Sequence, residues 1–253
     1  MVLGCGPRGA PLPTVVHVDE DTGNRWLAEH ADEARLDYLV TLPFGYGDDP
    51  QRPWPLIVFL HSLAERGLPI DVLIDNPVGE GPGLARFALA DPDFPFLTVS
   101  PLCPRRRHWP MVRGRLDALL AEVTERYPVD RDRIYLTGVS MGGMGTWALA
   151  MAHPGWFAAI APISGGIYSP PMREDVAALR HVPVWAFHDR SDPEIPISRE
   201  QGTIDRLESA GGTVRYTVTD QGEHYLQAGI YAEAELFDWF LEHRRHQAVT
   251  SGG

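Results

Sequence analysis

The chain has 253 residues, enough for one large domain with a substantial core, and its hydrophobic share of 44% is ordinary for a globular protein. Its formal net charge of −12 disfavours contact with phosphate backbones, so we predict no nucleic-acid partner. All 22 basic residues are arginines, which excludes enzymes that need a lysine Schiff base or a P-loop lysine.

The composition of the two ends of the chain and the number of cysteines indicate the domain organisation and the expected state of the thiols. Residues 1–13 are rich in Gly and Pro and are predicted to be a flexible N-terminus, residues 248–253 a flexible C-terminus, and residues 14–247 a single domain. No apolar stretch approaches the roughly 18 residues of a membrane span, and no signal peptide is visible, so we expect a cytoplasmic protein while secretion stays open. Cys5 and Cys103 are too few for a disulfide framework, and Cys103 is expected to be a free, buried thiol.

Apolar patterns alternate along the chain between those of strands and those of helices. Short continuous apolar runs are typical of strands buried on both faces, and a spacing of three and four is typical of helices. The alternation predicts an α/β fold built from crossover units, with a mostly parallel central sheet and helices on both faces. The roughly 20 residues between the predicted strands Phe157–Ile163 and Val182–His188 are too few for a cap domain. The predicted strands are Leu36–Leu42, Leu56–His61, Phe96–Ser100, Arg133–Gly138, Phe157–Ile163, Val182–His188 and Thr213–Thr219, and the predicted helices are Leu84–Ala90, Arg113–Tyr127, Met141–Ala152, Ser198–Ala210 and Tyr225–Arg245.

The sharpest chemical signal is the run Gly138-Val139-Ser140-Met141-Gly142, a G-x-S-x-G pattern between a predicted strand and a predicted helix. In this context a tight turn lifts the serine above the sheet, and the small residues on either side prevent a collision between strand and helix. We therefore predict that Ser140 is a nucleophile. Ser164 also follows a strand, but it lacks the preceding glycine and is interpreted as a pocket wall.

An activated serine needs a base and an acid, which this kind of turn places in the chain order Ser, Asp or Glu, His. His224 follows the last predicted strand and precedes the final helix, so it is the candidate base. Asp189 and Asp192 both follow the strand Val182–His188. Asp192 is preferred as the acid because it lies further out in a loop stiffened by prolines, while Asp189 could cap the turn.

Backbone donors are needed where negative charge develops on the carbonyl oxygen of an ester under attack. The amide of Met141 follows the nucleophile directly, and the amide of Leu63 lies in the loop after the strand Leu56–His61. His61 is expected to brace this loop and border the substrate. Trp109 is expected to form an aromatic wall or pack in the core, and Ile195 to supply an apolar substrate contact.

A metal site is the alternative interpretation of the histidines and carboxylates. His188, Asp189, Asp192 and His224 could supply ligands, but no pair among them has the i, i+3 or i, i+4 spacing on a predicted helix that is typical of metal ligands. We predict no metal and no cofactor.

Together these segments resemble the α/β-hydrolase superfamily, and more closely the compact bacterial esterases grouped with predicted peptidases and polyhydroxybutyrate-depolymerase-like esterases, relatives of feruloyl and acetyl-xylan esterases. The matching segments are LHSLAERG (60–67), VSPLCP with the nearby HWP (99–110), RIYLTGVSMGGMGTWALAMAHPGWFAAIAPISGG (133–166), PVWAFHDRSDPEIP (183–196) and GEH (222–224). The sequence departs from the family pattern at Ser62 and Asp189, where glycine usually follows a histidine.

The resemblance implies Ser140 as nucleophile, Asp192 as acid and His224 as base, with Leu63 and Met141 as oxyanion donors. It implies a serine carboxylesterase. Because no cap domain is predicted, the site is expected to be open and to suit short-chain or aryl esters, with feruloyl, acetyl-sugar and hydroxyalkanoate esters as candidates. A peptidase or thioesterase of the same fold, and a catalytically silent binding protein, are the alternatives. The expected partner is a small-molecule ester, and a homodimer is compatible with the sequence.

Overall fold

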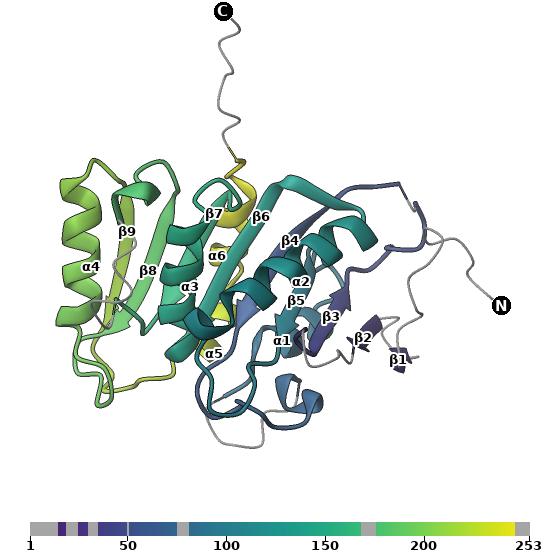
Figure 1. Cartoon of the computed structure of the whole chain (residues 1–253), viewed down its shortest axis with the longest axis horizontal. Helices are drawn as coiled ribbons and strands as arrows, with labels where there is room; N and C mark the ends of the chain where they lie inside the picture. Colours follow the sequence, from purple (N-terminus) through teal and green to yellow (C-terminus); the bar gives the residue numbers. More distant parts are fainter. Residues whose placement is uncertain are drawn as a thin grey trace, which may run out of the picture.

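A mixed β-sheet runs through the molecule (Figure 1). The computed structural model describes residues 15–18, 25–29, 35–49, 51–74, 81–167 and 176–245. The expected flexible segments 1–13 and 248–253 lie outside these residues. Within the described ranges, nine strands pair in the order β1-β2-β3-β5-β4-β6-β7-β8-β9. They are β1 (Val15–Val18), β2 (Arg25–Glu29), β3 (Tyr38–Leu42), β4 (Trp54–Leu60), β5 (Leu97–Pro101), β6 (Val129–Val139), β7 (Ala159–Ile163), β8 (Val184–Asp189) and β9 (Val214–Thr219).

Strands β5, β4, β6, β7, β8 and β9 run parallel, and β1, β2 and β3 continue the sheet in antiparallel pairing from β5. Parallel strands must be joined by crossover segments, which here are mainly helices. The helices are α1 (Leu84–Ala90), α2 (Arg113–Arg126), α3 (Met141–Ala152), α4 (Ser198–Ser209), α5 (Gln227–Ala232) and α6 (Ala234–Leu241), with 3₁₀ turns η1 (Ile70–Leu73), η2 (Trp109–Val112) and η4 (Val176–Leu179).

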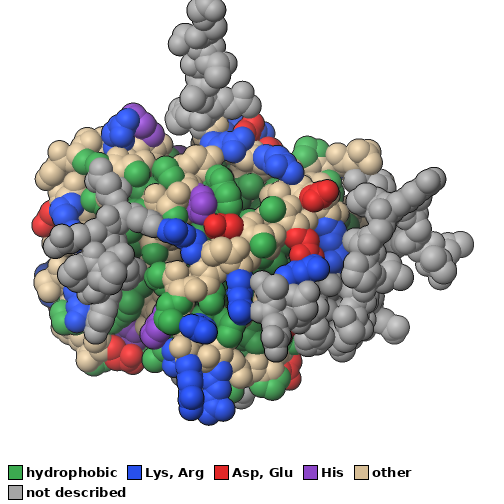
Figure 2. All heavy atoms as spheres, viewed as in Figure 1, with side chains coloured by type: hydrophobic (Ala, Val, Ile, Leu, Met, Phe, Trp, Pro, Cys, Tyr) green, Lys and Arg blue, Asp and Glu red, His purple; other side chains and the backbone are tan. Residues whose placement is uncertain are grey.

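Two hydrophobic cores lie on opposite faces of the sheet because successive side chains of a strand point to opposite sides. In β4, Leu56, Val58 and Leu60 belong to a core with side chains of α2, α3 and α4. Ile57 and Phe59 belong to the other core, with α1, α5 and α6. Figure 1 shows α2, α3 and α4 in front of the sheet and α1, α5 and α6 behind it, and Figure 2 shows charged side chains of both signs scattered over the front face. This arrangement confirms the predicted fold class.

The sequence prediction differs from the structure most clearly at the last predicted helix and at the first strands of the sheet. The predicted single helix Tyr225–Arg245 is wrong, because the backbone of Glu233 is extended (φ −97°, ψ 134°) and separates α5 from α6. The break lets Tyr231 of α5 and Phe237 and Phe240 of α6 all reach the same core. Strands β1 and β2 were not predicted, since they are short and pair only with each other and with β3.

No helix within the described ranges is both long enough and apolar enough to cross a membrane. Cys103 is a free thiol buried in the core, as predicted. The parallel strands all end at one edge of the sheet, where open α/β sheets place their ligands. The loops after β4, β5, β6, β8 and β9 carry the predicted site residues to this edge.

Candidate active site

Ser140 occupies the sharp turn between β6 and α3. Its backbone has φ 56° and ψ −115°, a conformation that non-glycine residues rarely adopt and that is typical of strained functional turns. The turn is fixed by hydrogen bonds from Ser140 N to Ile163 O (2.9 Å) and from Met144 N to Ser140 O (2.9 Å). The strain is therefore held in place by β7 on one side and by the first turn of α3 on the other.

The glycines around Ser140 are required by close backbone packing. A Cβ atom on Gly142 would lie 1.8 Å from Leu60 O, and one on Gly138 would lie 2.6 Å from Leu60 O and from Gly142 O. Both neighbours are backbone atoms, which cannot move without displacing β4 or α3. The G-x-S-x-G pattern therefore reflects the packing of α3 against the ends of β4 and β6.

We expect Gly142→Ala to lower the free energy of unfolding by about 3 kcal/mol or more, because the methyl group overlaps the backbone of Leu60. Urea unfolding measures the change. Gly202→Ala is the matched control, since Gly202 lies within α4 with open space around it and alanine there should stabilise by about 0.5–1 kcal/mol. Equal stability of Gly142→Ala and the wild type would contradict the packing argument.

The structure brings together the three side chains that the sequence predicted from distant segments. His224 Nε2 lies 2.7 Å from Ser140 Oγ, and His224 Nδ1 lies 2.7 Å from Asp192 Oδ2. With the proton on Nδ1 donated to Asp192, Nε2 is free to accept the hydroxyl proton of Ser140. Ser140 is 7% exposed and His224 is 4% exposed, so water only partly solvates this chain of hydrogen bonds.

Asp192 is oriented by its own loop. Its Oδ1 accepts hydrogen bonds from the amides of Glu194 and Ile195, both at 2.8 Å. These bonds leave Oδ2 aimed at His224. The side chain of Ile195 is buried, and its carbonyl accepts a hydrogen bond from His188 Nε2 at 2.9 Å. The backbone of Ile195 therefore supports the loop of Asp192, and a substrate contact by its side chain stays a prediction.

Asp189 does not contact His224 as Asp192 does, but accepts hydrogen bonds from the loops after β8 and β9. Its carboxylate accepts hydrogen bonds from the amides of Ser191, Gln221 and Gly222 and from the hydroxyl of Thr219, at 2.7–3.1 Å. Burial raises the pKa of Asp189, but these four donors outweigh burial and lower it to about 2. Asp189 thus caps its turn and ties the β8 loop to the loop that leads to His224.

Ser164 anchors the backbone of His224. Its hydroxyl donates to His224 O at 2.7 Å, and its side chain is fully buried. The interpretation of Ser164 as a pocket wall is therefore corrected. Its positive φ of 47° is a second point of backbone strain beside Ser140.

His61 and Trp109 form a buried brace under the loop after β4. His61 Nε2 accepts a hydrogen bond from Cys103 N (2.9 Å), so His61 Nδ1 donates to Ser62 O (2.6 Å), and Trp109 Nε1 donates to His61 O (3.0 Å). Burial lowers the pKa of His61 to about 4, so the ring is neutral at pH 7. Both side chains are at most 1% exposed. His61 therefore braces the loop and Trp109 packs in the core, as expected, while the expectation that either side chain contacts the substrate is corrected.

The two candidate oxyanion donors belong to the loop after β4 and to the start of α3. Within the described part of the chain, the amides of Leu63 and Met141 donate to no protein acceptor. Ser62 replaces the glycine of the family pattern without a positive φ, and its hydroxyl donates to Glu65 Oε2 at 2.6 Å. The departure at Ser62 therefore introduces no left-handed backbone strain into this loop.

Two acidic residues near the triad were missed by the sequence reasoning. Glu194 Oε2 lies 3.6 Å from His224 Nε2 on a side chain that is 52% exposed. Glu200 is fully buried, with Oε2 3.9 Å from His188 Nδ1. The only signal available was their nearness to Asp192 along the chain. Among the described residues, no group of three or more His, Cys, Asp or Glu side chains is arranged to hold a metal ion.

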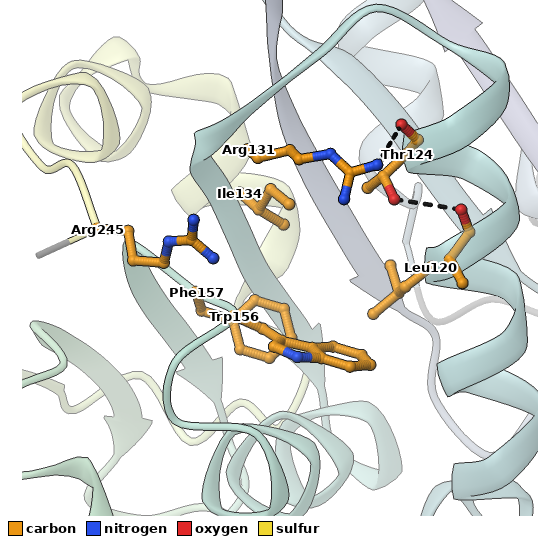
Figure 3. Close-up of a pocket in the computed structure, with 8 residues that line it drawn as sticks. Leu120, Thr124, Arg131, Ile134, Trp156, Phe157 and Arg245 are labelled. Carbon is orange, nitrogen blue, oxygen red and sulfur yellow. Dashed lines mark hydrogen bonds between the residues drawn. The ribbon is translucent and has the colours of Figure 1, made fainter. Parts of the chain in front are cut away.

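A separate pocket of ≈ 220 Å³ lies toward the other edge of the sheet, with Arg131, Trp156 and Arg245 on its walls (Figure 3). Ile134, which also lines it, precedes Ser140 by six residues of strand, or about 20 Å. Arg131 donates to a carbonyl of α2, and Arg245 pairs with an aspartate. Both guanidinium groups thus have structural partners away from the serine site.

The fold and this edge of the sheet define an α/β hydrolase. No family model matches the chain. It is 31% identical over 213 residues to the poly(3-hydroxyoctanoate) depolymerase of Pseudomonas fluorescens, covering 82% of this chain and 68% of that one. The chain belongs to the α/β-hydrolase superfamily, within the group of carboxylic ester hydrolases that contains this relative.

Two further comparisons agree with that placement. The chain is 28% identical over 167 residues to feruloyl esterase C of Emericella nidulans, covering 64% of this chain and 56% of that one. It therefore spans about half the length of that esterase. The crystal structure of a thermostable esterase superposes with a TM-score of 0.70 at 28% identity, over 91% of this chain and 62% of that one.

Proposed function

We propose that this chain is a serine carboxylesterase in which Ser140, His224 and Asp192 form the catalytic triad. The observation that carries the proposal is the unbroken chain of hydrogen bonds from Ser140 Oγ to His224 Nε2 and from His224 Nδ1 to Asp192 Oδ2, at 2.7 Å each. Its position at the carboxyl edge of the sheet and the esterase relatives support the same reading.

The chemistry is a two-step acyl transfer. Ser140 Oγ attacks the ester carbonyl carbon while His224 Nε2 takes the hydroxyl proton, and Asp192 stabilises the resulting imidazolium. The amides of Leu63 and Met141 donate to the oxyanion of the tetrahedral intermediate. His224 returns the proton to the leaving alcohol, and the acyl group stays on Ser140. Water, deprotonated by His224, then releases the carboxylic acid and restores the serine hydroxyl.

Short-chain and aryl esters are the proposed substrates. The 20 residues between β7 and β8, from Ser164 to Pro183, are too few for a cap domain, which favours an open site. Leu63, at the proposed oxyanion loop, has a side chain that is 47% exposed and offers an apolar contact beside the site. The names of the relatives favour feruloyl and hydroxyalkanoate esters within this class.

A panel of p-nitrophenyl esters from acetate to dodecanoate tests both activity and substrate class. A buried acyl channel would raise kcat/KM about fourfold per CH₂, since each buried CH₂ contributes about 0.8 kcal/mol. We expect hydrolysis without such a rise, because an open site buries little of a long acyl chain. Feruloyl and acetylated-sugar esters, with peptide p-nitroanilides for comparison, complete the panel. A steady rise toward dodecanoate, or cleavage of anilides in preference to esters, would overturn the assignment.

A further inference from the structure

A buried acid–imidazole pair lies directly behind the proposed triad acid. Glu200, in the first turn of α4, and His188, at the end of β8, are both fully buried. Glu200 Oε2 and His188 Nδ1 lie 3.9 Å apart, and neither atom has a hydrogen-bond partner in the described part of the chain. That separation exceeds the usual hydrogen-bond limit by about 0.7 Å, a gap that a small side-chain movement closes.

The other nitrogen of His188 points to the triad. His188 Nε2 lies 2.9 Å from Ile195 O and 3.3 Å from Asp192 Oδ2. A carbonyl and a carboxylate are both acceptors, so Nε2 must carry a proton. The same Asp192 Oδ2 is bonded to His224 Nδ1. The polar groups therefore form one continuous row from Glu200 through His188, Asp192 and His224 to Ser140.

Proton accounting leaves two states in which Glu200 Oε2 and His188 Nδ1 share a proton: a neutral imidazole beside a protonated carboxyl, or an imidazolium beside a carboxylate. A neutral His188 with its proton on Nε2 has a lone pair at Nδ1. An ionised Glu200 would place a carboxylate oxygen, a second acceptor, against that lone pair, with no proton between them. A protonated Glu200 would instead present an O–H there. Its other oxygen, Oε1, accepts a hydrogen bond from Trp147 Nε1 at 2.9 Å. The neutral pair satisfies both orphaned atoms with a single proton.

The surroundings favour the neutral state over the ion pair. Burial raises the pKa of Glu200 to about 8 and lowers the pKa of His188, so each group disfavours its charged form at pH 7. The other titratable groups that influence the pair are Asp192, Asp189 and His224 around His188, and Tyr216 of β9 beside Glu200.

We propose that Glu200 and His188 are positioning residues of the Ser140 site: protonated Glu200 donates to His188 Nδ1 and thereby holds the Nε2–H of His188 on Asp192. The inference rests on the proposed triad, because its effect passes through Asp192. Without this donor, His188 can change tautomer and turn a lone pair toward the carboxylate. Asp192 then loses one of the contacts that aim it at His224.

Two substitutions at Glu200 separate a hydrogen-bond donor from a charge. Glu200→Gln keeps an N–H donor for His188 and a carbonyl for Trp147, whereas Glu200→Met has a similar size and no donor. We expect Glu200→Met to lower kcat about 10- to 30-fold with KM unchanged, and Glu200→Gln to stay within about threefold of the wild type. Glu208→Gln and Glu208→Met, at an exposed position of the same helix, are the controls.

The outcomes are distinct. If Glu200→Gln is as impaired as Glu200→Met, an ionised carboxylate is required and the proposal is overturned. If both variants keep wild-type kcat and only lose thermal stability, Glu200 is merely structural. If Ser140→Ala has no effect on the ester panel, the proposed function itself fails. Difference infrared spectroscopy of the wild type at pH 7 gives a readout without activity: the carbonyl band of a protonated carboxyl must be present and must disappear in Glu200→Gln.

Discussion

Ser140→Ala is expected to reduce kcat for p-nitrophenyl acetate by about 10⁴-fold or more, because the triad acts as one unit and the remaining donors cannot supply a nucleophile. The melting temperature should hardly change. Alanine keeps the Cβ atom, so the strained φ of 56° at this turn is neither relieved nor worsened. Only the hydroxyl and its hydrogen bond to His224 are lost.

Initial-rate assays of ester hydrolysis and labelling by a fluorophosphonate probe test this prediction. The probe should label the wild type and should not label Ser140→Ala. Ser164→Ala is the matched control, since Ser164 also follows a strand but donates its hydroxyl to His224 O. It should keep the label and lose no more than about tenfold in kcat. Persistent turnover in Ser140→Ala, or loss of labelling in Ser164→Ala alone, would move the nucleophile elsewhere.

Asp192→Asn is expected to lower kcat by about 10⁴-fold while the fold stays intact. The amide can still accept from Glu194 N and Ile195 N through its oxygen, but its NH₂ group then faces His224 Nδ1. His224 Nδ1 would have to become an acceptor, which places the ring proton on Nε2 and points it at Ser140. A base in that tautomer cannot take the serine proton.

Asp189→Asn distinguishes the two aspartates. Its expected effect is mainly on stability, because an amide offers one acceptor oxygen and its NH₂ opposes the donors that now bind Asp189. We expect kcat to fall by no more than about 30-fold, through loosening of the loop before His224. A larger loss of kcat in Asp189→Asn than in Asp192→Asn would reassign the acid.

The pH dependence of stability offers an independent check on Asp189. Its pKa in the folded protein is about 2, below the unfolded value of about 3.9, so the unfolded chain binds protons more readily. The contribution of Asp189 to stability is therefore fully present above about pH 4 and is lost as the pH falls toward 2. Urea unfolding between pH 5 and 2 should show a flatter profile for Asp189→Asn than for the wild type.

Much of the candidate site could be predicted because its information is local in the chain. Gly138, Ser140 and Gly142 identify a strand–turn–helix junction from five residues, and the structure explains the glycines by contact with Leu60 O. The positions of Asp192 and His224 after successive strands indicated one shared edge, since parallel strands end together. In the structure, Asp192 Oδ2 lies 2.7 Å from His224 Nδ1, and His224 Nε2 lies 2.7 Å from Ser140 Oγ.

The errors share one cause. His61 and Trp109 were expected at the substrate, besides bracing the loop or packing in the core, because they stand near site residues in the chain. Their side chains are buried and hold the loop after β4 in place. Glu233 stands in a stretch of good helix formers, but packing of α5 and α6 on one core requires an extended residue there. Neighbours along the chain do not reveal which way a side chain points.

By itself, the sequence determined the class of fold, the serine turn and the order of acid and base, because periodicity, glycine placement and strand ends are properties of short segments. The sequence favoured Asp192 over Asp189 as the acid, but only the tertiary structure shows the contact of Asp192 with His224, which aromatic side chains are buried, and that Glu200 lies next to His188. These features depend on contacts between residues far apart in the chain: Asp192 and His224 are 32 positions apart, and Trp147 and Glu200 are 53 positions apart. Such contacts form only when separate strands and helices pack, so no local pattern encodes them.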